Sequence, residues 1–102
     1  MDVKPGSRWK SAVDSTEVVV VRPPKGAVSI ECGGHAMVPL GSEVPAGLEI
    51  SPAFSAGTSV GKRYVEAESG IELLGSKAGP GSLSVDGRPV DLKDAKPLPA
   101  SD

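Results

Sequence analysis

The sequence SRWKSAVDSTEVVVVR, residues 7–22, is the longest stretch of the chain without glycine or proline. It contains four consecutive valines, at positions 18–21, whose branched side chains favour strands over helices. Elsewhere 13 glycines and 10 prolines interrupt the chain, and both residues destabilise helix interiors. The other uninterrupted windows are about two helical turns long, below the ~12–15 residues that an isolated helix needs. The sequence therefore predicts an all-β fold with at most one short helical turn.

Alternating segments predict the first strands. Residues 8–13 form the first candidate, and residues 16–22 have valines on both faces, which predicts an inner strand covered on both sides. Two prolines then begin a turn that leads into an alternating segment at 28–32. We expect 16–22 and 28–32 to form an antiparallel hairpin with Cys32 on its apolar side.

Two more hairpins are predicted in the last third of the chain. Residues 64–67 and 71–74 are joined by a short loop in which Gly70 is left-handed; a three-residue loop would pair Val65 with Leu73. Further on, the dipeptide Asp86-Gly87 is a strong two-residue hairpin signal. Roughly seven short strands of this kind predict a small compact barrel or sandwich of antiparallel hairpins.

The expected organisation is one all-β domain over residues 1–94, followed by an extended tail over 95–102. Glycine and proline are so frequent between 37 and 61 that only residues 47–50 have strand character. We expect 37–61 to be a partly ordered loop with one short strand, because long structureless connections are uncommon in compact domains.

Composition limits the classes of partner. The chain has 11 basic and 13 acidic residues and a net charge of −2, and no basic stripe of the kind that nucleic-acid binding needs. No apolar run approaches the ~18 residues of a membrane span. One cysteine cannot form an internal disulfide, and the first residues lack the features of a secretory signal. These features predict a cytoplasmic protein without nucleic-acid or membrane partners.

Cys32 and His35 are the only cysteine and the only histidine, and they flank two glycines. Three interpretations are open for this segment: a structural turn with a half-buried cysteine, a metal site, or a reactive thiol. The structural turn is favoured, because free cysteine is most often a small core residue and a closed zinc site needs four ligands.

The segment CGGHAM, residues 32–37, also resembles half of the metal knuckle of desulforedoxin-like and rubredoxin-like proteins. The resemblance implies that Cys32, with His35 nearby, could bind zinc or iron. The chain lacks the preceding cysteine and the second knuckle of that family, so Asp14, Glu31 or a symmetry-related copy would have to complete the site. The expectation is that no cofactor is bound, with zinc or iron as the alternative.

Two further patterns could indicate catalytic sites. Residues 57–61 match the expression G-x-S-x-G, but no strand precedes them and no helix can follow, so the hydrolase interpretation is rejected. Glu66 and Glu72 would oppose each other in the expected hairpin, where Glu68 lies close by. A solvated sheet edge is favoured there over an acid/base pair.

We therefore expect a non-catalytic accessory or interaction module whose partner is another protein or a second copy of the chain. The alternative is a metal-binding or thiol-based redox or sensing protein with its site at Cys32 and His35. The predicted partner contacts are apolar residues of the middle loop: Met37, Val38, Leu40 and Phe54.

Overall fold

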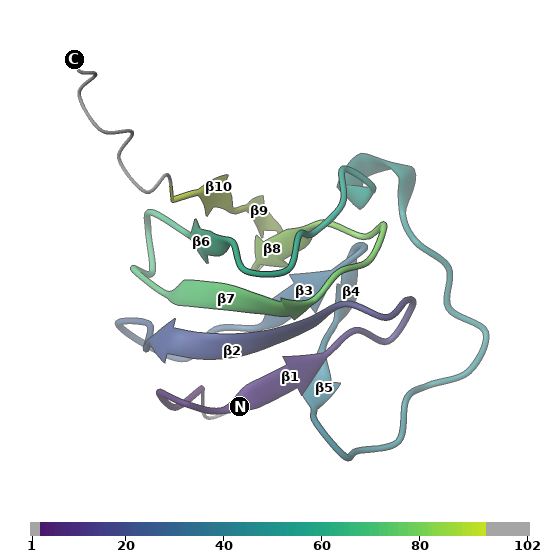
Figure 1. Cartoon of the computed structure of the whole chain (residues 1–102), viewed down its shortest axis with the longest axis horizontal. Helices are drawn as coiled ribbons and strands as arrows, with labels where there is room; N and C mark the ends of the chain where they lie inside the picture. The colour runs from purple at the N-terminus through teal and green to yellow at the C-terminus, as the bar shows by residue number, and fades with distance from the viewer. Residues whose placement is uncertain (1–2, 94–102) are drawn as a thin grey trace.

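The computed structural model describes residues 3–93, which form two antiparallel sheets that share one core (Figure 1). The prediction of an all-β fold is confirmed, and the arrangement is a sandwich rather than a closed barrel. The expected tail at 95–102 lies outside the described residues. The elements are β1 (Arg8–Lys10), β2 (Glu17–Arg22), β3 (Ile30–Cys32), β4 (His35–Ala36), β5 (Val38–Pro39), the single 3₁₀ turn η1 (Pro52–Phe54), β6 (Arg63–Val65), β7 (Glu72–Lys77), β8 (Leu83–Val85), β9 (Arg88–Pro89) and β10 (Asp91–Leu92).

The larger sheet has the strand order β10-β6-β7-β2-β1-β5, and the smaller has β4-β3-β8-β9. The larger sheet faces the viewer in Figure 1, with β3, β4 and β8 behind it. Most of the core consists of aliphatic side chains, since the chain has only three aromatic residues. The buried core residues are Trp9, Val18, Val20, Ile30, Cys32, Met37, Ile71, Leu73, Leu83 and Val85.

The position predicted for β2 is correct, but the prediction that both of its faces are buried is wrong. The strand is internal, between β1 and β7, and Val18 and Val20 are buried. Val21 on the other face is 40% exposed, so only one face of the strand is covered.

The expected hairpin between β2 and β3 is wrong. β3 pairs with β4 and β8 in the smaller sheet, so residues 23–29 carry the chain from one sheet to the other. Pro23 and Pro24 correctly predict that β2 ends at Arg22. A turn signal, however, does not determine which strand pairs with the one that follows the turn. Residues 47–50 are also not a strand, and the short strand of the middle segment is β5.

The two C-terminal hairpins are confirmed, one of them with a different register. Gly70 is left-handed with φ +77°, but Val65 pairs with Glu72 rather than with Leu73. The turn is one residue longer than expected because the Gly70 N–H donates to the Glu66 carbonyl at 2.8 Å. In the β8–β9 turn, Asp86 and Gly87 both have positive φ, 50° and 81°, as a type I′ hairpin requires.

Each outer strand of the two sheets is two residues long: β5, β10, β4 and β9. Pro39 in β5 and Pro89 in β9 have no N–H to donate. Among the described residues, therefore, neither sheet ends in a long unpaired strand.

Candidate functional site

The segment around Cys32 and His35 is a tight turn between β3 and β4. The two residues are directly paired across the ladder, and Gly33 and Gly34 between them have φ of +63° and +85°. A Cβ at Gly33 would lie 2.7 Å from Val13 Cγ2, so the turn also lacks room for a side chain. Backbone geometry and close packing thus account for both glycines.

Cys32 and His35 meet different surroundings despite this pairing. Cys32 is fully buried, and its Sγ lies 3.9 Å from Asp14 Oδ1. His35 is half-buried, and its Nε2 lies 2.8 Å from the Glu49 carbonyl oxygen. Burial raises the pKa of the Cys32 thiol, and the Asp14 charge adds to this effect, so the thiol is held in the protonated form that is a poor nucleophile.

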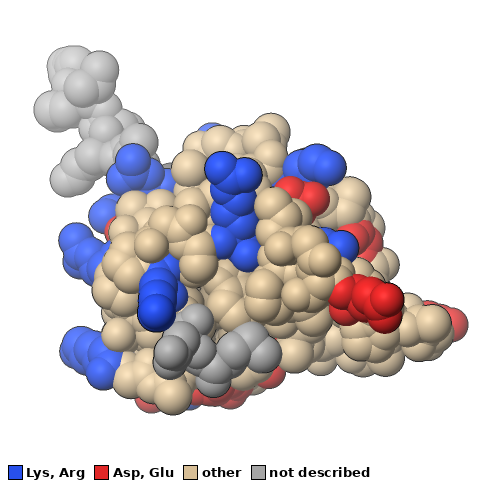
Figure 2. Space-filling view, turned by 90° about the horizontal axis from the view of Figure 1, so that it is seen from below, with Lys and Arg blue, Asp and Glu red and all other residues tan. Residues whose placement is uncertain are grey.

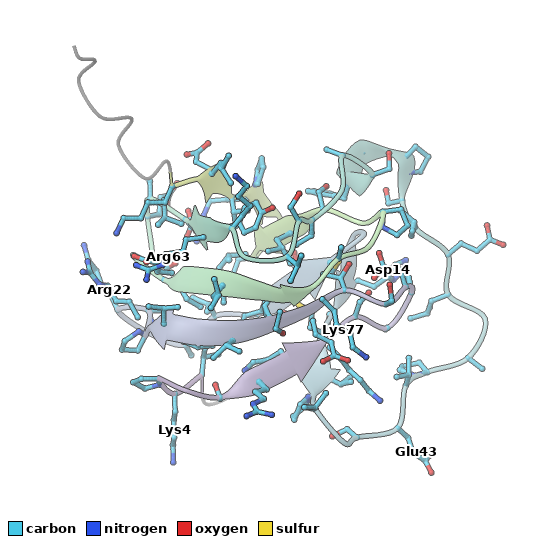
Figure 3. The ribbon with its side chains drawn as sticks, in the orientation of Figure 1. Lys4, Asp14, Arg22, Glu43, Arg63 and Lys77 are labelled. Atoms are coloured by element: carbon cyan, nitrogen blue, oxygen red, sulfur yellow. The ribbon has the colours of Figure 1, made fainter. Side chains whose placement is uncertain are left out.

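Asp14, which lies on the loop between β1 and β2 (Figure 3), holds the distant segment at Gly81 through its carboxylate. Its Oδ1 accepts the Thr16 N–H at 3.0 Å, and its Oδ2 accepts the Gly81 N–H at 2.6 Å. Burial alone would raise the pKa of Asp14, but the hydrogen bonds from the Thr16 and Gly81 amides outweigh burial and lower it. A Cβ at Gly79 or Gly81 would lie 2.8 or 2.9 Å from Oδ2, which explains the glycines around Pro80.

Within residues 3–93, no group of three or more histidine, cysteine, aspartate or glutamate side chains gathers in a way that could hold a metal ion. The side chain near the Cys32 thiol is that of Asp14, whereas the His35 ring contacts the Glu49 carbonyl. Glu31, the other acid considered as a ligand, instead accepts hydrogen bonds from Ser84 Oγ and the Gly87 N–H, both at 2.9 Å.

Glu66 and Glu72 are buried, with relative exposures of 3% each, so the expected solvated edge is wrong at these positions. Glu66 accepts two hydrogen bonds of 3.0 Å from the Arg88 guanidinium and further bonds from the Glu68 and Ser69 amides. The side-chain hydrogen bond from Arg88 is the main reason that the pKa of Glu66 lies far below its usual range.

Glu72 has its own cations. Lys93 Nζ lies 2.9 Å from one of its oxygens, and Arg63 Nη1 lies 3.5 Å from the other. The hydrogen bond from Lys93 is the leading cause of its lowered pKa. Because Glu66 and Glu72 both favour the ionised form, neither has the raised pKa of a general acid at neutral pH. Sequence spacing alone could not reveal the two closest partners, because Arg88 and Lys93 lie 22 and 21 positions away from the glutamates that they contact.

The four predicted partner contacts lie in three different places. Met37 is a core residue with 2% exposure, so its side chain is not on the surface. Val38 is half-buried in β5, and Leu40 is 41% exposed just after it. Phe54 is half-buried and lines a hollow of about 410 Å³ together with Tyr64, Leu83 and Val90.

After Leu40 the chain leaves the sandwich and arcs away from both sheets before it returns at Ser51 (Figure 1). We call residues 41–49 the projecting loop. Val44 and Leu48 within it are 38% and 36% exposed. The sequence predicted a loop over 37–61, which contains this segment, but it predicted a strand at 47–50 and did not single out Val44 or Leu48, which show no periodicity.

Comparisons of the chain with protein-family models, curated proteins and solved structures gave no match. The resemblance of residues 32–37 to a metal knuckle therefore stays a prediction. Among the described residues, no helix has the length and apolar character needed to cross a membrane.

Proposed function

We propose that the protein is a small non-catalytic binding module that contacts another protein chain through the projecting loop. The observation that carries this proposal is the exposure of Val44 and Leu48 on a loop whose backbone arcs away from both sheets (Figure 1), with Leu40 exposed just before it. Exposed apolar groups that gather on one functional loop are typical of interaction sites on rigid scaffolds.

The attachment of the loop supports the same proposal. Its backbone is tied to the body near its two ends, where the Leu40 N–H donates to the Arg8 carbonyl and the Ser51 N–H to the Gly33 carbonyl. Between positions 43 and 50, one hydrogen-bond contact with another described residue is present, and it joins the Glu49 carbonyl oxygen to His35 Nε2. A partner strand or surface would therefore find most of the loop's backbone groups available.

Site-specific photo-crosslinking in the cells that make the protein tests this function. A photoreactive residue at Val44 should give an adduct of discrete mass, and Leu48→Ser should reduce its yield severalfold. Val60, which is 61% exposed outside the loop, is the matched control position. Equal labelling from positions 44 and 60, or no adduct from position 44, would contradict the proposal.

A further inference from the structure

The outer face of the larger sheet carries a regular row of side chains. Trp9, Val18, Val20 and Leu73 point into the core, so the residues that alternate with them lie on the opposite face. Arg8 pairs with Val19, Val19 with Leu74, and Leu74 with Arg63. We call these four residues, which cross β1, β2, β7 and β6, the arginine row.

The arginine row has an apolar centre and basic ends. Val19 and Leu74 are half-buried, and Arg8 and Arg63 are exposed. Neighbouring strands lie about 4.8 Å apart, so the two arginine backbones are about 14 Å apart. Arg8 forms no ion pair with another described residue, and Arg63 keeps 56% of its side chain exposed beside Glu72.

The projecting loop has the opposite charges in the same order. Its sequence from 43 to 49 is EVPAGLE, in which Glu43 and Glu49 flank Val44 and Leu48. Seven extended residues reach about 20 Å or slightly more, and the left-handed Gly47, with φ +82°, turns the segment and shortens it. The loop therefore offers acidic, apolar, apolar and acidic groups over a length of at most about 20 Å, which is enough to cover the arginine row of about 14 Å.

The arginine row and the projecting loop lie in different parts of the molecule. Figure 2 shows most lysine and arginine over the left and upper parts of the view; acidic residues lie at the right-hand end, where the loop lies in Figure 1, and also at the upper right and along the lower edge. Glu43 points away from both sheets in Figure 3, whereas Arg63 lies on the sheet itself.

Building on the proposed function, we propose that the partner of the loop is a second copy of this chain, with its arginine row as the docking surface. Glu43 and Glu49 would meet the two arginines, and Val44 and Leu48 would cover Val19 and Leu74. Because loop and row are different surfaces, the contact is head-to-tail, and it leaves one free loop and one free row for further copies. The assembly would then grow with concentration into short chains or a closed ring.

Sedimentation velocity of the full chain, measured over a concentration series at low and high salt, tests this inference. The average mass should rise with concentration and fall with salt, since the contact depends on opposite charges. Arg8→Glu and Glu43→Lys should each weaken association roughly tenfold or more. Lys25→Glu, an exposed charge reversal outside the arginine row, should leave association unchanged.

The decisive variant combines Arg8→Glu with Glu43→Lys, because the exchanged charges attract again and association should return. Leu48→Ser provides a neutral second variant that leaves the sheet untouched and should also weaken association. A chain that stays monomeric at every concentration, or a combined variant that folds but does not recover, would overturn the inference. In that case a discrete adduct with a different protein at Val44 would still support the proposed function, whereas its absence would remove both proposals.

Discussion

Two pairs of glutamates in this protein have opposite surroundings. Glu66 and Glu72 are buried, and Arg88, Lys93 and Arg63 neutralise them from inside the same chain. Glu43 and Glu49 are exposed on the projecting loop and form no ion pair with another described residue. The difference teaches that the same residue type stabilises the fold in one region and is available to a partner in the other.

The largest effect is expected from acid, which acts on all the internal carboxylates together. The pKa values of Glu66, Glu72 and Asp14 are lowered in the folded protein. Groups of this kind stabilise the fold above their ordinary pKa, and the contribution is lost as pH falls through the folded value. The free energy of unfolding, measured by urea titration, should fall steadily from about pH 5 toward pH 2. A flat profile over this range would show that these carboxylates contribute little.

The next effect is expected from Glu66→Gln, which removes the charge that faces Arg88. The cost should be about 2–3 kcal/mol, because hydrogen bonds to a charged group are lost and a guanidinium loses its partner. Glu68→Gln is the matched control, since Glu68 lies 3.9 Å from the same arginine with 73% of its side chain exposed. It should cost less than about 0.5 kcal/mol. Similar losses from both variants in urea titration would argue against the importance of burial.

Asp14→Asn should lower the free energy of unfolding by less, about 1–2 kcal/mol, because the hydrogen bonds that it weakens come from neutral backbone amides. An amide nitrogen cannot accept the Gly81 N–H and would leave that bond unmade. Ser15→Ala, which removes an exposed hydrogen bond to the Ala78 carbonyl, is the control for the neighbouring position. Added salt should change the Asp14→Asn loss less than the Glu66→Gln loss. The reverse order would mean that Asp14 acts mainly as a charge.

Cys32→Ala should cost about 1 kcal/mol, the loss of a small buried group. The native thiol should also react with a disulfide reagent far more slowly than the thiol of the unfolded chain, since it is buried and its pKa is raised. Absorbance of the released thiolate measures both rates. Fast labelling of the folded protein would restore the reactive-thiol interpretation.

The smallest effect on stability is expected from Glu43→Lys, below about 0.5 kcal/mol, because the side chain is exposed and contacts no other charged group among the described residues. Thermal unfolding at a dilution where the chain is monomeric measures this. A large loss would place Glu43 with the internal acids and remove the contrast between the two pairs.

Residues that favour one backbone geometry predicted the strands and turns well. The valines of β2, the left-handed Gly70 and the Asp86-Gly87 turn all act within a few positions, and each forms the predicted strand or turn, although the cover of β2 and the register at Gly70 differ. The pairing of β2 with β7 instead of β3 was missed, because partner choice depends on how distant strands bury a common core. The contact between Glu66 and Arg88 was missed for the same reason, since Glu66 follows β6 of the larger sheet and Arg88 lies in β9 of the smaller sheet.

The short, proline-containing outer strands have a consequence for how this molecule behaves at high concentration. A sheet that ends in a long bare strand can recruit copies edge to edge and grow into cross-β fibrils. Here all four outer strands are two residues long, and Pro39 and Pro89 each remove an N–H from one of them, so the described sheet edges offer few backbone groups for such growth. Any polymer of this chain should stay soluble and dissociate on dilution, because side chains and not continuous ladders would hold it.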